Sequence, residues 1–277
     1  MASSPDARYA GPIKAVIFDW AGTTVDFGCC APAAVFIEVF KRRGIEVSQT
    51  QARGPMGMHK RDHIRILTRL EHVATQWERQ HSRRPTEDDV ESMFAEFVPL
   101  QVEAIKRHAD IIPGAIETIA ALRARGIKIG STTGYNDEMM AALTPITTNA
   151  GYIPDCIVTV SDVQEGRPAP WMALEAASRL GVYPMAACVK LGDTVADIGE
   201  GLNAGMWSIG VVEHGNEVGL TQEEFAALSK SDRAARCSVA RKRLENAGAH
   251  YVIDRIAELP RIVTEIEDGV YSQERRA

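Results

Sequence analysis

The stretch Ile17-Phe18-Asp19-Trp20-Ala21-Gly22-Thr23-Thr24-Val25-Asp26 decides the fold. The apolar run from Ile13 to Phe18, interrupted by one lysine, predicts a short buried strand that ends at Asp19. In open α/β sheets ligands bind beyond the carboxyl ends of the strands, so Asp19 is expected at a binding edge. These residues alone leave two interpretations open: a nucleophile or metal ligand, or an aspartate that caps a turn.

Beyond residue 108 the sequence alternates between apolar runs and helical segments. The runs 127–132, 156–159, 189–191, 206–212 and 250–253 predict strands, an alternation typical of a parallel, doubly wound, Rossmann-like sheet. Residues 27–108 are rich in helix formers and contain no convincing strand. We therefore predict an α/β core domain of residues 1–26 and 109–277, with an all-helical cap domain, residues 27–108, inserted after the first strand.

The composition is that of an ordinary globular protein, with 277 residues, 45% hydrophobic and 25% charged. The net charge of −6 gives no electrostatic reason to expect a nucleic acid partner. No apolar run reaches the roughly 20 residues that cross a bilayer. The N-terminal residues 1–11 lack the apolar segment of a signal peptide and are expected to be a frayed tail.

The five cysteines are odd in number and form no Cys-x-x-Cys pair. This pattern indicates a reducing cytoplasm and no structural zinc site. Four of them are expected in the core, whereas Cys29, just after the first motif, either packs there or lines a site.

Polar or charged side chains follow four of the predicted strands: Asp19, Thr133, Arg167 and Asp193. The carboxyl ends of parallel strands meet at one edge of the sheet, so these side chains should converge. Two carboxylates are suitable ligands for Mg²⁺, and a hydroxyl and a guanidinium can hold phosphoryl oxygens. The sequence therefore predicts a phosphate and Mg²⁺ site at this edge.

This ordered set resembles the haloacid dehalogenase superfamily over nearly the whole chain. The resemblance implies that Asp19 attacks phosphorus to form an aspartyl phosphate. It also implies one Mg²⁺ per subunit held by Asp19 and Asp193, with Thr194 and Asp197 supporting these ligands from behind.

One position departs from the superfamily pattern. Phosphatases of this superfamily carry a second aspartate two residues after the nucleophile, which protonates the departing oxygen, and here that position is Ala21. Either this chain is a poor catalyst or its leaving group is not an oxygen.

The predicted cap contains an unusual lysine in Gly54-Pro55-Met56-Gly57-Met58-His59-Lys60-Arg61-Asp62-His63-Ile64-Arg65. At about 100° per residue, Lys60 and His63 share the apolar stripe of a helix with Ile64 and Leu67. Lys60 is either a lysine that extends past its apolar neighbours to solvent, or a desolvated amine able to form a Schiff base. His63 is either a packing histidine or a proton shuttle for that amine.

Together these features closely resemble the phosphonatase (phosphonoacetaldehyde hydrolase) family over about residues 13 to 255. The matching segments are Asp19-Trp20-Ala21-Gly22-Thr23-Thr24-Val25-Asp26, Pro55-Met56-Gly57, Lys60, His63, Ser131-Thr132-Thr133-Gly134-Tyr135, Gly166-Arg167-Pro168-x-Pro170-Trp171-Met172 and Gly192-Asp193-Thr194.

The resemblance implies cleavage of a carbon–phosphorus bond in phosphonate degradation, with acetaldehyde and phosphate as products, by a Mg²⁺-dependent homodimer. The implied catalytic residues are Asp19, Lys60, His63, Thr133 and Arg167. The implied third metal ligand is the backbone carbonyl of Ala21. The implied substrate contacts are Cys29, Met56, Gly57 and Tyr135.

Two other functions remain open from the sequence. A Mg²⁺-dependent phosphomonoesterase of the same fold would need a substitute for the acid missing at Ala21. A non-catalytic phosphate-binding module would have no reason to retain all four strand-end residues, Asp19, Thr133, Arg167 and Asp193.

Overall fold

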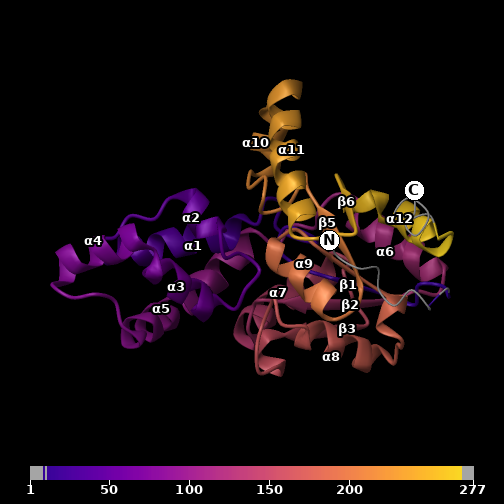
Figure 1. Ribbon diagram of the computed structural model, residues 1–277, viewed down its shortest axis with the longest axis horizontal. Coiled ribbons are helices and arrows are strands. Elements are labelled where there is room, and N and C mark those ends of the chain that lie inside the picture. Colours follow the sequence, from indigo (N-terminus) through magenta and orange to yellow (C-terminus); the bar gives the residue numbers. More distant parts are fainter. Residues whose placement is uncertain (1–8, 10, 270–277) are drawn as a thin grey trace.

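The protein is built on one six-stranded parallel sheet, seen in a computed structural model that describes residue 9 and residues 11–269 (Figure 1). The strands are β1 (Ala15–Phe18), β2 (Lys128–Thr133), β3 (Cys156–Thr159), β4 (Cys188–Gly192), β5 (Trp207–Val211) and β6 (Tyr251–Ile253). Their order is β3-β2-β1-β4-β5-β6, so the chain changes direction across the sheet between β1 and β4. This is the switch point at which doubly wound sheets bind ligands, and the predicted fold class is confirmed.

Helices cover both faces of the sheet. They are α6 (Ala115–Ala124), α7 (Asp137–Asn149), α8 (Trp171–Leu180), α9 (Val195–Asn203) and α12 (Leu259–Glu267). Along β1, Ala15 and Ile17 belong to the apolar cluster under α8, whereas Val16 and Phe18 belong to the larger cluster on the opposite face. Both faces of β1 are therefore dry, which explains the nearly continuous apolar run in the sequence.

The segment between β1 and α6 contains helices and connecting turns but no strand among its described residues. These helices are α1 (Cys30–Lys41), α2 (Gln49–Arg53), α3 (Lys60–Arg69), α4 (Glu71–His81) and α5 (Glu87–Arg107), and they form a separate lobe in Figure 1. Leu70 adopts an extended conformation with ψ 126° and separates α3 from α4. The boundaries 27 and 108 remain predictions.

The segment between β5 and β6 contains α10 (Gln222–Ala227) and α11 (Lys230–Asn246). Figure 1 shows α11 projecting from the sheet domain, with its C-terminal end near β5 and β6. The predicted N-terminal tail lies mostly outside the described residues. Among the described helices, none is both long and apolar enough for a membrane crossing.

Two connections join the helical lobe to the sheet, and they run side by side. Asp26 N–H donates to the Asp110 carbonyl at 3.1 Å, and Val25 forms an antiparallel bridge with Ile111. The Asp26 carboxylate accepts hydrogen bonds from the N–H groups of Cys30 and Ala31, each at 3.0 Å, and so caps the start of α1. Burial raises the pKa of Asp26 to about 6.

Replacing Asp26 should therefore weaken the junction. Asp26→Ala leaves two N–H groups at the start of α1 without their acceptor, and we expect the free energy of unfolding to fall by about 1–2 kcal/mol. Urea denaturation at pH 7.5 measures this change. Asp88→Ala, at an exposed position in the first turn of α5, is the control and should change stability by less than about 0.5 kcal/mol. Equal stabilities of the two variants would contradict the capping role.

Candidate active site

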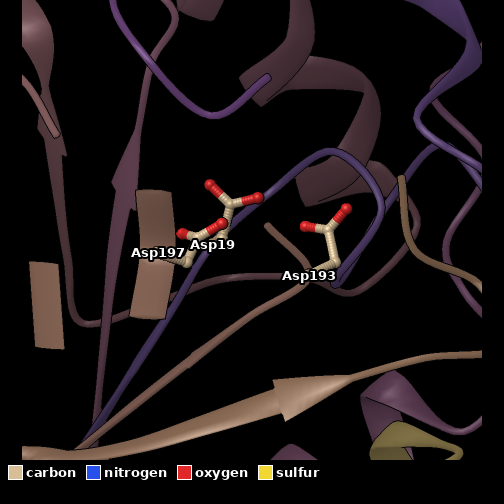
Figure 2. A group of neighbouring side chains, drawn as sticks. All are labelled: Asp19, Asp193 and Asp197. Carbon is tan, nitrogen blue, oxygen red and sulfur yellow. The ribbon is translucent and has the colours of Figure 1, made fainter. Parts of the chain in front are cut away.

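Three aspartates converge at the carboxyl edge of the sheet (Figure 2). Asp19 follows β1, Asp193 follows β4, and Asp197 lies in the first turn of α9. Their nearest ligand atoms lie within 4.8 Å of one another, and all three side chains are buried. The Thr194 side chain caps α9 by accepting from Asp197 N–H, while its hydroxyl donates to the Asp197 carboxylate at 2.6 Å. The predicted convergence of Asp19 and Asp193 is thus seen, with Asp197 beside them.

The Arg167 guanidinium is fixed by hydrogen bonds and ion pairs to its neighbours, and it also contacts Asp19, the candidate nucleophile. Its Nη1 lies 2.6 Å from Asp19 Oδ1 and 3.0 Å from Asp197 Oδ1. Its Nε donates to Glu200 at 2.7 Å, and Nη2 donates to the Thr132 carbonyl and hydroxyl at 2.8 and 2.7 Å. This clamp orients Nη1 toward Asp19.

Sequence reasoning missed Glu200, Lys190 and Thr132. Lys190 is 0% exposed and lies 2.8 Å from Asp197 Oδ1 and 3.3 Å from Glu200 Oε2. A lysine inside the apolar strand β4, and an acid three residues after Asp197 on α9, are the signals that identify the first two. Thr132 alternates with Thr133 along β2 and carries no such signal.

The buried polar cluster is short of positive charge. It contains four carboxylates (Asp19, Asp193, Asp197 and Glu200) but only two cations (Arg167 and Lys190), all at most 5% exposed. A formal charge of −2 in a buried site is costly unless a cation enters. The deficit matches one divalent ion.

Asp193 is the carboxylate of this cluster that has no positively charged partner among the described residues. Its recorded hydrogen-bond partners are neutral: the Thr23 hydroxyl at 2.9 Å and the Asn216 N–H at 2.7 Å. Burial, and the nearby charges of Asp19 and Asp197, raise the pKa of Asp193 well above its usual range. By contrast, Arg167 and Lys190 outweigh burial at Asp197 and lower the pKa of that carboxyl. The donors at Asp193 and Asp19 are hard oxygens and fit Mg²⁺.

The backbone at Ala21 offers a third oxygen. Two hydrogen bonds flank this residue, from Val25 N–H to the Trp20 carbonyl at 3.0 Å and from Gly22 N–H to the Val25 carbonyl at 2.7 Å. The Ala21 carbonyl itself accepts no backbone hydrogen bond within the described part of the chain. Gly22 has φ 88°, and a Cβ there would lie 2.2 Å from Asp193 Oδ2, so only glycine permits this turn.

Lys60 faces the same place from the helical lobe. It begins α3, is 4% exposed, and its Nζ lies 5.2 Å from the centre of the Tyr135 ring. Burial lowers the pKa of Lys60, and the neighbouring Cys29 and Asp19 only partly oppose this. The predicted apolar stripe is confirmed, because His63, Ile64 and Leu67 are buried with it.

A small cavity of about 20 Å³ lies between the helical lobe and the ends of the strands. It contains nearly all of the predicted catalytic and substrate-binding residues. Its lining is Asp19, Ala21, Cys29, Met56, Gly57, Lys60, Thr133, Gly134, Tyr135, Arg167 and Thr194.

His63 lies behind Lys60 and is not among the residues that line this cavity. It stacks on Phe36, with ring centres 3.7 Å apart, and its Nε2 lies 2.9 Å from the Ala52 carbonyl. That carbonyl can only accept, so Nε2 carries the proton and Nδ1 is an acceptor. Nδ1 is buried and has no hydrogen-bond partner among the described residues. Burial, with the charge of Lys60, lowers the pKa of His63 well below its usual value.

Two glycines let the lobe and the sheet touch. A Cβ on Gly57 would lie 2.3 Å from Thr194 Oγ1, and one on Gly134 would lie 2.8 Å from the Met58 carbonyl. Side chains at these positions would hold the lobe away from the sheet.

The charge deficit gives a direct test. In Asp193→Asn the cluster loses one negative charge, so we expect a higher melting temperature than wild type in the absence of divalent ions. Wild type should gain about 2.7 kcal/mol when Mg²⁺ is present at about a hundred times its dissociation constant, and the variant should gain almost nothing.

Thermal unfolding of both proteins, with EDTA and with MgCl2, measures these changes. Asp268→Asn, at an exposed position after α12, is the control and should respond to Mg²⁺ like wild type. Equal Mg²⁺ responses in Asp193→Asn and wild type would show that the cation does not bind here.

Comparison with known proteins places these residues in a family. A phosphonoacetaldehyde hydrolase from Syntrophobacter fumaroxidans is 49% identical over 94% of each chain. A bifunctional phosphonoacetaldehyde hydrolase/aminoethylphosphonate transaminase from Clostridioides difficile is 50% identical over 94% of this chain, which spans only 41% of that relative's length.

A solved structure is also close: the crystal structure of a phosphonoacetaldehyde hydrolase-like protein from Oleispira antarctica. It is 42% identical, covers 95% of both chains and superposes with a TM-score of 0.93. The model of the haloacid dehalogenase-like hydrolase family matches residues 13–205. The chain therefore belongs to the haloacid dehalogenase-like hydrolases.

Proposed function

We propose that this protein hydrolyses the carbon–phosphorus bond of phosphonoacetaldehyde to acetaldehyde and phosphate, a step of phosphonate degradation. The observation that carries the proposal is the shared cavity of Lys60 and Asp19, in which position 21 is alanine. The relatives named as phosphonoacetaldehyde hydrolases at 46–49% identity support it.

The chemistry explains why both residues are needed. A carbanion is a very poor leaving group, so displacement at phosphorus alone does not break the bond. The neutral amine of Lys60 first condenses with the aldehyde, releasing water, and the resulting imine takes up one proton to give an iminium. Asp19 then attacks phosphorus while the electrons of the breaking bond flow into the iminium, which becomes an enamine. Protonation at carbon and hydrolysis of the imine and the aspartyl phosphate release the products and regenerate both side chains.

Burial prepares the amine for this role. At its reference pKa of about 10.4 a lysine is only roughly 0.04% neutral at pH 7. Burial lowers the pKa of Lys60 and increases that fraction. We assign to His63 the movement of a proton at Nδ1, which is buried without a partner among the described residues. Cys29, Met56, Gly57 and Tyr135 line the cavity, and we propose that they contact the substrate when the lobe opens to admit it.

Other residues hold the phosphoryl group. Thr133 Oγ1 accepts from Tyr135 N–H at 3.1 Å, which leaves the hydroxyl proton available to a phosphoryl oxygen. Arg167 Nη1, fixed beside Asp19, is placed to hold a second oxygen. We propose one Mg²⁺ per subunit, held by Asp19, the Ala21 carbonyl and Asp193; when bound, it supplies the positive charge that neutralises the phosphoryl oxygens.

The size of the cavity requires the lobe to move. About 20 Å³ holds roughly one water molecule, far less than the substrate. Residues 56–60 cover it from the lobe and the strand ends cover it from the sheet. We therefore propose that the lobe opens to admit substrate and closes to exclude water.

A phosphomonoesterase is the second candidate, because the family and the phosphoryl-holding residues are compatible with it. Ala21 weighs against this function, since an alkoxide leaving group needs a proton donor at that position.

We further propose a cytoplasmic homodimer. All five cysteines are free, as expected in a reducing compartment.

Trapping of the imine tests the role of Lys60. Borohydride added with phosphonoacetaldehyde should inactivate the enzyme and add a reduced two-carbon or phosphonate-bearing adduct at Lys60, identified by mass spectrometry. Lys60→Arg, which keeps the charge but forms no imine, should be inactive and unlabelled. Lys230→Arg, at an exposed position that begins α11, is the control and should be labelled like wild type. An unmodified Lys60 in inactivated enzyme would refute the Schiff-base route.

Substrate comparison separates the two candidate activities. Phosphate release from phosphonoacetaldehyde should exceed release from a panel of phosphate monoesters by several orders of magnitude in kcat/KM. Asp19→Asn should abolish release from both, because the nucleophile is lost. Faster turnover of any monoester would favour the phosphatase, and no Mg²⁺-dependent turnover at all would favour a binding module.

A further inference from the structure

One residue of the sheet domain contacts both Asp193 and the helical lobe. Asn216, in the segment between β5 and α10, is 2% exposed. Its backbone N–H donates to Asp193 Oδ2 at 2.7 Å. Its side-chain Oδ1 accepts from Arg53 Nη1 at 3.1 Å, and its Nδ2 donates to the Arg53 carbonyl at 3.2 Å. Asn216 therefore connects a candidate cation ligand to the lobe through direct hydrogen bonds.

On the lobe side of these hydrogen bonds, Arg53 lies just before the segment that carries Lys60. It ends α2, and the chain runs from it through Met56 and Gly57 to Lys60. Besides Asn216, its Nη1 donates to the Gly28 carbonyl at 2.6 Å and more weakly to the Cys29 carbonyl at 3.3 Å. One guanidinium thus ties together the first connection, the lobe and the sheet domain.

The contact surface for Arg53 is shaped for a planar group. A Cβ on Gly219 would lie 2.7 Å from Arg53 Nε and 2.8 Å from its Cζ, and Gly219 has φ 66°. The guanidinium therefore lies directly against the Gly219 backbone, where no side chain fits.

Further contacts fix the segment that contains Asn216. Glu217, whose side chain is 2% exposed, lies 2.7 Å from Arg243 of α11. The His214 carbonyl accepts from Gly28 N–H at 2.8 Å. This bracing gives a role to α11, the helix that projects from the sheet domain in Figure 1.

We propose that Arg53 and Asn216 are positioning residues that couple closure of the helical lobe to cation binding at Asp193. The proposal rests on the proposed function. With the lobe closed, Arg53 fixes Asn216, and the Asn216 N–H then fixes the orientation of the Asp193 carboxylate toward Asp19. Because such coupling is reciprocal, cation binding favours the closed lobe by the same factor.

The test measures Mg²⁺ binding to the whole protein without substrate. Asn216→Ala removes both side-chain bonds but keeps the N–H to Asp193, and Arg53→Lys keeps the charge but loses the planar fork. Isothermal titration should show Mg²⁺ bound at least about fivefold more weakly by each variant. The double variant should be no weaker than the weaker single one. The matched controls are Asn246→Ala and Arg84→Lys, both exposed, and they should bind Mg²⁺ like wild type.

A second measurement reports on the lobe. In Mg²⁺, amide hydrogen exchange over residues 26–30 and 54–60 should be faster in both variants than in wild type, with β4 unchanged. Arg53 borders a cavity of about 520 Å³, so a lysine there is readily hydrated, and Arg53→Lys provides the test if Asn216→Ala does not fold.

Unchanged Mg²⁺ affinity in a folded variant overturns the proposal. Weaker Mg²⁺ binding with unchanged amide hydrogen exchange over residues 54–60 also overturns it, because the substitution would then affect the cation site without affecting the lobe. Neither readout needs turnover, so a wild-type enzyme that fails to cleave phosphonoacetaldehyde would refute the proposed function while leaving this coupling to be judged by its own measurements.

Discussion

An excess of buried negative charge at the switch point of the sheet is the constraint on which the rest of the structure depends. The excess is unevenly distributed. Arg167 contacts Asp19, Asp197 and Glu200, and Lys190 contacts the last two, whereas the partners of Asp193 are neutral. Among these carboxylates Asp193 lacks a positively charged partner, so we expect an entering cation to bind at Asp193 rather than beside Asp197 and Glu200.

Burial acts on the acids and on the amine of the same cavity in opposite directions. It raises the pKa of Asp193 and lowers the pKa of Lys60, because the neutral form is favoured in each case. The sheet side has compensating cations and the lobe side does not. Burial also raises the pKa of Asp19, and Arg167 and Lys190 partly oppose this by favouring the ionised carboxylate, whereas burial at Lys60 favours the neutral amine.

How much was predictable follows from the range of the interactions. Asp19, Thr133, Arg167 and Asp193 were predicted because parallel strands bring their ends together, whatever the details of the helices. Lys60 was predicted because it interrupts a helical stripe, a pattern within one turn. For Glu200 the sequence offers only a weak signal, which is its spacing of three residues from Asp197 on one helix. The pairing of Arg53 with Asn216 joins residues 163 positions apart and has no local pattern at all.

The paired connections between the lobe and the sheet have a mechanical consequence. Asp26 and Asp110, and next to them Val25 and Ile111, are joined by backbone contacts, so the two chain segments bend as one ribbon. A ribbon two segments wide resists twisting and sideways sliding more than it resists folding along its width. We therefore expect the proposed opening to be a rotation about this paired connection, which would return Lys60 to one orientation relative to Asp19 each time the lobe closes.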